Sequence, residues 1–88
     1  MAGAPRLLLY GTLGCHLCEV ARARTEPVAV AFGWRLEERD VADDEALAAR
    51  YGARIPVLAR SDRGDELAWP FDSDALVAWL ALPGQERR

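Results

Sequence analysis

The chain has 88 residues, of which 51% are hydrophobic and 28% charged, and its net charge at pH 7 is −3. This length and composition fit one globular domain, residues 1–88 with a core at about 6–82, and exclude wholesale disorder. The eleven cationic residues are all arginine and are scattered along the chain, so nucleic acid is not expected as a partner. No apolar run is long enough for a membrane span or the core of a signal peptide.

The first half of the chain predicts a strand, a helix and a second strand. Residues 6–11, RLLLYG, form a short apolar run that ends in glycine, as a buried strand does. Helical spacing follows within residues 12–33, where Pro27 is expected to kink or interrupt the helix and Gly33 to end it. The apolar positions assigned to this helix are Leu17, Val20, Ala21, Val28 and Phe32. Residues 34–41, WRLEERDV, read as a strand whose polar content predicts a sheet edge.

The second half predicts a helix, two strands and a last helix. Asp43 is the predicted N-cap of a short helix at 44–51, which Gly52 ends. Residues 55–60 and 65–69 read as strands joined by a turn at 62–64, and hence as an antiparallel hairpin. Asp72 is the predicted cap of the last helix, whose apolar face carries Leu76, Trp79 and Leu80. Residues 1–5 and 83–88 read as loose ends.

This order, βαβαββα, predicts the fold class. A strand–helix–strand unit requires its two strands to run parallel with a right-handed crossover, whereas the final hairpin is antiparallel. The sequence therefore predicts an α/β protein with a four-stranded mixed sheet and helices on both faces.

The two cysteines of the chain, Cys15 and Cys18, stand two residues apart with its single histidine, His16, between them. A CxxC pair beside a βαβ unit is typical of the thioredoxin-like redox fold. Two alternatives remain, because the same pair also supplies two soft metal or iron–sulfur ligands, and because such a fold also serves as a binding module. A structural staple is disfavoured, since so short a loop restricts little chain entropy.

The position of the pair between a strand and a helix assigns roles to its members. Free amides and the positive end of the helix dipole favour an anion at Cys15, so Cys15 is the expected nucleophile. Cys18 lies one turn further along the helix and is the expected resolving thiol. Gly11 and Gly14 are expected to let the loop turn without a side chain in the way of a substrate.

Three stretches together resemble the glutaredoxins, in particular compact bacterial glutaredoxin-like proteins whose active site reads CHLC. They are LLLYGTLGCHLC, RIPVL and FDSDALVAWL, and the resemblance covers about residues 6–82. It implies a thioredoxin-like fold and a dithiol thiol–disulfide oxidoreductase with Cys15 and Cys18 as catalytic residues. It also implies a cis peptide bond at Pro56 beside the cysteines. We expect Gly14, His16, Ile55 and Pro56 to contact the substrate.

The chain differs from ordinary glutaredoxins where glutathione is bound. Thr12 stands in place of a lysine, Arg54 in place of a threonine, and no glycine pair precedes the last helix. These differences argue against a typical glutathione site. We expect no metal and no resident cofactor, with glutathione considered as a reducing cosubstrate beside a thioredoxin-reductase-type reductant. The expected substrate is a disulfide-containing protein or a small-molecule thiol, and the expected state is a cytoplasmic monomer.

His16, Arg54 and the pair Trp69 and Phe71 each have a functional interpretation and a purely structural one. The imidazolium of His16 would stabilise the Cys15 thiolate, or His16 is a solvated residue at the start of a helix. Arg54 would offer Cys15 a cation, or it faces solvent. Trp69 and Phe71 would form an apolar lip beside the site, or they pack in or around the core.

Overall fold

The elements observed in a computed structural model follow the predicted order. The structure describes residues 5–84, so most of the predicted loose ends, residues 1–4 and 85–88, lies outside the described residues. The elements are β1 (Arg6–Gly11), α1 (His16–Ala31), β2 (Arg35–Asp40), the 3-10 helix η1 (Val41–Asp43), α2 (Glu45–Tyr51), β3 (Val57–Arg60), β4 (Glu66–Ala68) and α3 (Ser73–Ala81). The short helix η1 is the one addition to the predicted series.

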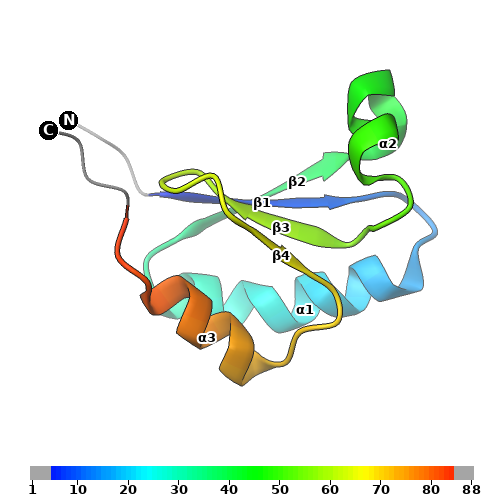
Figure 1. Cartoon of the computed structure of the whole chain (residues 1–88). Coiled ribbons are helices and arrows are strands. Elements are labelled where there is room, and N and C mark those ends of the chain that lie inside the picture. The colour runs from blue at the N-terminus through cyan, green and yellow to red at the C-terminus, as the bar shows by residue number, and fades with distance from the viewer. Residues whose placement is uncertain (1–4, 85–88) are drawn as a thin grey trace, which may run out of the picture.

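The sheet is mixed, as predicted, with strand order β2-β1-β3-β4. Strand β1 pairs parallel with β2 and antiparallel with β3, and β4 is antiparallel to β3. The polar strand β2 therefore lies at an edge of the sheet, which confirms its predicted place. Helices α1 and α3 lie together against one face, and α2 stands at one end of the opposite face (Figure 1).

The main core lies between the sheet and the α1–α3 layer. Alternation along β1 sends Leu7 and Leu9 into this core. Its other buried members are Ala21, Ala29, Leu58, Phe71, Leu76, Trp79 and Leu80. A smaller cluster of Val41, Tyr51 and Val57 lies toward α2. The predicted apolar face of α3 is confirmed, because its three predicted residues are buried.

Helix α1 differs from its prediction in two respects. It runs unbroken through Pro27, so an interruption there is wrong. The Ala23 carbonyl receives no backbone hydrogen bond from position 27, because proline has no amide hydrogen. Ala23 and Pro27 are both exposed to solvent, so water can donate to that carbonyl. The buried face of α1 also consists of small or polar residues, Cys18, Ala21, Thr25 and Ala29, whereas Leu17 and Phe32 are 49% and 43% exposed.

The N-cap of α2 is one residue later than predicted. Asp40 accepts a hydrogen bond from the Ala42 amide and begins η1, which uses Asp43 as its last residue. Asp44 is therefore the cap of α2, and its carboxylate accepts hydrogen bonds from the amides of Ala46 and Leu47 at 2.8 and 3.3 Å. The predicted cap of α3 is confirmed, since Asp72 accepts from the Ala75 amide at 2.8 Å.

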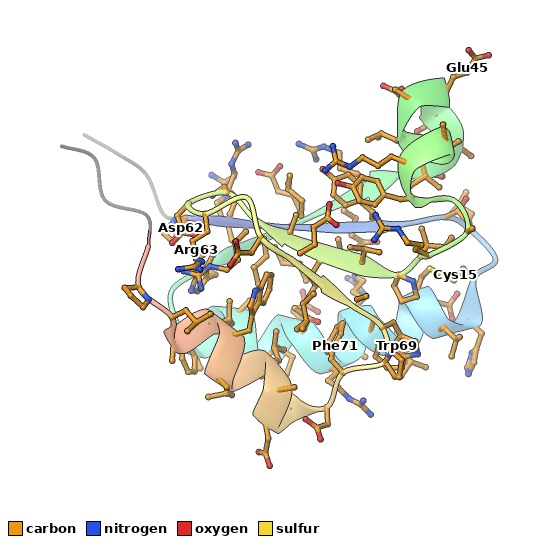
Figure 2. All side chains as sticks on the ribbon, in the orientation of Figure 1. Cys15, Glu45, Asp62, Arg63, Trp69 and Phe71 are labelled. Atoms are coloured by element: carbon orange, nitrogen blue, oxygen red, sulfur yellow. A yellow bond between two sulfur atoms is a disulfide. The ribbon has the colours of Figure 1, made fainter. Side chains whose placement is uncertain are left out.

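A buried arginine fastens the end of β3 to the end of α3. Arg60 is 2% exposed, and its guanidinium lies over the rings of Trp34 and Trp79. It donates two hydrogen bonds to Asp62, at 2.9 and 2.7 Å, and others to the carbonyls of Trp79 and Leu82. Figure 2 shows Asp62 at the opposite end of the molecule from Cys15. Arg60, although arginine is usually exposed to solvent, is therefore buried within the fold and lies far from the cysteines.

None of the helices in residues 5–84 combines the length and the apolar character that crossing a membrane requires.

Candidate functional site

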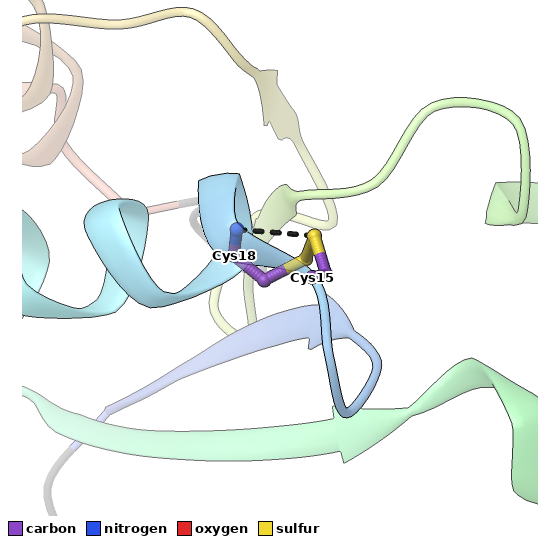
Figure 3. Close-up of a disulfide and its surroundings, with 2 residues drawn as sticks. All are labelled: Cys15 and Cys18. Carbon is purple, nitrogen blue, oxygen red and sulfur yellow. Dashed lines mark hydrogen bonds between the residues drawn. A yellow bond between two sulfur atoms is a disulfide. The ribbon is translucent and has the colours of Figure 1, made fainter.

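The loop from β1 to α1 places Cys15 as the N-cap of the helix. Its backbone is extended, with φ −93° and ψ 104°, and its sulfur accepts a hydrogen bond from the Cys18 amide at 3.1 Å (Figure 3). A serine or aspartate oxygen normally fills this capping role. Here sulfur fills it, so one amide hydrogen and the positive end of a 16-residue helix are directed at the Cys15 side chain.

Cys15 and Cys18 form a disulfide, with their Cα atoms 5.2 Å apart. The two sides of this bond differ in exposure, because Cys15 is half-buried while Cys18 is only 7% exposed. A partner molecule in solution can therefore reach Cys15 more easily than Cys18.

The predicted substrate-contact residues Gly14 and His16 flank Cys15 and are both exposed. Gly14 has a positive φ of 79°, which favours glycine, and the chain turns there from the loop into α1. Two leucines of the same segment are exposed: Leu13 was not singled out from the sequence, and Leu17 was assigned to the apolar positions of the helix. Leu13 is 90% and Leu17 is 49% exposed, so apolar surface lies on both sides of Cys15 along the chain.

The remaining predicted contacts, Ile55 and Pro56, lie at the same end of the sheet. The Ile55–Pro56 peptide bond is cis, as the resemblance implied. Because Tyr10 pairs with Val57, one step along the antiparallel register sets Pro56 opposite Gly11, the last residue of β1. Figures 1 and 3 both show the segment that enters β3 passing the start of α1. The structure thus gathers all the predicted site residues at one end of the molecule.

A cavity of about 320 Å³ opens on the β2 side of the pair. The first turns of α1, the β1–α1 loop and the end of β2 form its walls, and Cys18 contributes to them. Two arginines in its walls are already paired. Arg22 contacts Glu38 at 2.6 Å, and Arg39 contacts Glu37 at 2.9 Å. The cavity thus borders Cys18 and also Leu13 and Gly14, the two residues before Cys15.

Arg54 does not fit the functional interpretation. Its guanidinium lies 3.5 Å from Glu66 and 5.4 Å from the centre of the Tyr51 ring. Tyr51 donates a hydrogen bond to the same Glu66 at 2.7 Å, and this bond is the main cause that holds the pKa of Glu66 below its usual range. The interpretation of Arg54 as an outward, partly solvated residue is the one the structure supports.

The predicted lip of Trp69 and Phe71 is wrong for Phe71. Phe71 is 4% exposed and belongs to the main core, and Figure 2 shows it on the face of the sheet that α1 and α3 cover. Trp69 is half-buried and packs edge-on against Phe71 with ring centroids 5.1 Å apart. Its amide donates to the Pro56 carbonyl at 3.2 Å, and the Trp69–Pro70 peptide bond is also cis. Trp69 alone can present apolar surface beside Pro56.

Metal ligands are not gathered in the described part of the chain. Within residues 5–84, no group of three or more His, Cys, Asp or Glu side chains is arranged to hold a metal ion.

Three solved structures that are similar to this one match most of this chain and most of their own length. The crystal structure of target protein XcR50 from X. campestris is 44% identical, with a TM-score of 0.72, and the match covers 88% of this chain and 99% of that one. The solution structure of protein Ne2328 from Nitrosomonas europaea is 32% identical, with a TM-score of 0.75 and coverage of 92% and 96%. A mutant thioredoxin from Halobacterium salinarum is 26% identical, with a TM-score of 0.71 and coverage of 89% and 73%.

These likenesses confirm the thioredoxin-like fold. Among curated protein sequences the chain has no significant match. The model of the glutaredoxin-like domain family (DUF836) matches residues 6–81, which span every strand and helix described above. With its CxxC disulfide at the start of α1, the chain belongs to the glutaredoxin-like domain family.

Proposed function

We propose that this protein is a thiol–disulfide oxidoreductase that works through Cys15 and Cys18. One observation carries the proposal: the more exposed sulfur of a CxxC pair caps a helix and accepts an amide hydrogen bond, while its partner is buried. A thiolate, not a thiol, attacks a disulfide, and both the amide and the helix dipole favour negative charge on Cys15.

The reaction follows from this difference between the two sulfurs. The Cys15 thiolate attacks a substrate disulfide, forms a mixed disulfide and releases the first substrate thiolate. Cys18 loses its proton and attacks the Cys15 sulfur, which closes the internal disulfide and releases the second substrate thiolate. Two electrons pass to the substrate, and the two released thiolates take up the proton from Cys18 and, from water, the proton that Cys15 lost on ionising. An external thiol, either glutathione or a reductase, restores the dithiol.

The expected substrate is a disulfide-bonded protein or small molecule. The exposed leucines at 13 and 17 give a polypeptide apolar surface beside Cys15. A reducing compartment such as the cytoplasm is the expected place of action, because a free dithiol survives there. We expect the protein to act as a monomer.

The decisive experiment is equilibration of the protein across glutathione redox buffers, followed by alkylation and mass measurement of free thiols. We expect Cys15 and Cys18 to interconvert as one two-electron couple, with a midpoint between roughly −120 and −270 mV, the range of known oxidoreductases. Failure to form the internal disulfide, or a protein isolated with metal on its thiols, would contradict the proposal and favour the binding-module or metal alternative.

Single-cysteine variants test the assigned roles. Cys18→Ala should form a mixed disulfide with a model substrate and stop there, because the sulfur that releases the product is gone. Cys15→Ala should react much more slowly, since Cys18 is buried. Equal reactivity of the two variants would refute the assignment.

A further inference from the structure

Gly11 is the residue against which the Cys18 sulfur packs. It ends β1 and is buried. A Cβ atom added to Gly11 would lie 3.0 Å from the Cys18 sulfur and 3.1 Å from the Cys18 Cβ. Favourable contacts between carbon atoms lie at about 3.5–4.0 Å, and sulfur is larger. Even a methyl group at position 11 would therefore require Cys18 or the end of β1 to move.

The backbone at Gly11 does not itself require glycine. Positive φ among the glycines is confined, within the described chain, to Gly14, Gly33 and Gly64. At Gly14, in contrast, an added Cβ would meet no atom within 4 Å, so that residue is needed for its backbone conformation alone. What matters at Gly11 is the space that a side chain would fill.

The disulfide and dithiol forms of the cysteine pair differ in how well they tolerate a side chain at position 11. In the disulfide, the Cys18 sulfur is tethered to Cys15 and cannot turn away from Gly11. In the dithiol, it is free to rotate about the Cα–Cβ bond. The 320 Å³ cavity, whose walls include both Gly11 and Cys18, provides open volume next to it. The contact of the added methyl group with the Cys18 Cβ is the same in both states, whereas its contact with the Cys18 sulfur is relieved only in the dithiol, so the methyl group penalises the disulfide more.

We propose that Gly11 is a positioning residue for Cys18. Because Gly11 has no side chain, the internal disulfide is stabilised relative to the dithiol. This inference rests on the proposed redox function and adds a residue that sets its equilibrium. The reaction concerned is protein dithiol plus glutathione disulfide giving protein disulfide plus two glutathione thiols. Two electrons move from the protein thiols to the glutathione disulfide, and the two protons end on the glutathione thiols.

The test is the equilibrium constant of that exchange in the wild type and in Gly11→Ala. We expect the constant for disulfide formation to fall about tenfold in the variant, which corresponds to about 30 mV in midpoint potential. Gly52→Ala is the control, because its added Cβ meets the Ala48 carbonyl oxygen at the end of α2 instead. Its constant should equal that of the wild type whatever its effect on stability.

Stability measurements in both redox states separate positioning from a general packing defect. We expect Gly11→Ala to lower the unfolding free energy of the oxidised protein more than that of the reduced protein. Folding of the variant only when reduced would likewise support the inference. Equal losses in the two states, failure to fold in both, or an exchange constant within twofold of the wild type would overturn it.

The outcomes also separate this inference from the proposed function. If the wild type forms no internal disulfide in glutathione buffers, the oxidoreductase proposal fails and the role of Gly11 fails with it. If the wild type titrates as a two-electron couple and Gly11→Ala titrates identically, the role of Gly11 alone is refuted.

Discussion

Replacement of the buried Arg60 by alanine tests whether a polar cluster far from the cysteines carries a large share of the stability. The change removes both hydrogen bonds to Asp62 and the donor of the Leu82 carbonyl, and it leaves the Trp79 carbonyl with the Leu82 amide at 3.3 Å alone. Removal of one partner of a buried ion pair typically costs about 3–5 kcal/mol. Asp62 keeps 28% of its side chain exposed and can be rehydrated, so we expect a loss of about 3 kcal/mol.

Arg63 is the matched control in the same turn. It donates to Asp65 at 2.6 Å and to the Pro83 carbonyl at 2.7 Å, a pattern close to that of Arg60. Its side chain is 27% exposed, however, against 1% for Arg60. Arg63→Ala should therefore cost at most about 1 kcal/mol, the usual upper value for an exposed pair.

Urea unfolding followed by far-ultraviolet circular dichroism measures both losses on one scale. A chain of this length is expected to have a total stability of about 4–13 kcal/mol, so the Arg60 variant should lose a large fraction of it. With an m-value of about 1 kcal/mol/M, its midpoint should fall by about 3 M. Equal midpoints for Arg60→Ala and Arg63→Ala would refute the argument from burial. Failure of Arg60→Ala to fold while Arg63→Ala folds would likewise support the argument from burial.

Three further predictions concern single side chains. Thr25→Val should raise the unfolding free energy by about 1 kcal/mol, because the buried Thr25 hydroxyl has no hydrogen-bond partner among the described residues; a lower thermal midpoint would contradict this. Burial and the hydrogen bond to Glu66 raise the pKa of Tyr51 to about 12 from the ordinary value of 10. The contribution of the protonated Tyr51 to the unfolding free energy is therefore complete below pH 10 and is lost as the pH rises toward 12. Tyr51→Phe should lack this alkaline loss, and identical pH profiles of unfolding would refute it. Asp44→Ala should cost about 1 kcal/mol through the lost cap of α2 and Asp43→Ala much less, so the reverse order of thermal midpoints would contradict the cap assignment.

The features that depend on local sequence were predicted well. The uninterrupted apolar run ending in Gly11 gave β1 with its observed bounds, and Asp72 before an apolar helix gave the cap of α3. Asp43 and Asp44 are adjacent and chemically equal, so the sequence cannot say which one caps α2. The choice depends on Asp40, whose side chain begins η1 and places Asp43 inside it.

The features that depend on packing between distant segments were not predicted. Phe71 stands between a strand and a helix cap, where no periodicity tells whether a side chain points inward, so the sequence left lip and core both open, and the structure places it in the core. Arg60 is buried because its partners come from a turn and from the end of α3. Gly11 was expected to end the strand and to leave room for a substrate beside the loop, whereas its contact with Cys18 arises from the close approach of β1 and α1.

The arrangement of the sheet edges limits where another chain can attach. An exposed edge strand offers unpaired backbone groups to other chains, and charged side chains or shortness discourage such pairing. The edge strand β2 is charged at five of its six positions, and the opposite edge, β4, has three residues. Strand addition and edge-to-edge aggregation are therefore disfavoured on both sides. A protein that carries exposed leucines around Cys15 is thereby expected to stay dispersed, and we propose that any partner chain binds at the cysteine end of the molecule.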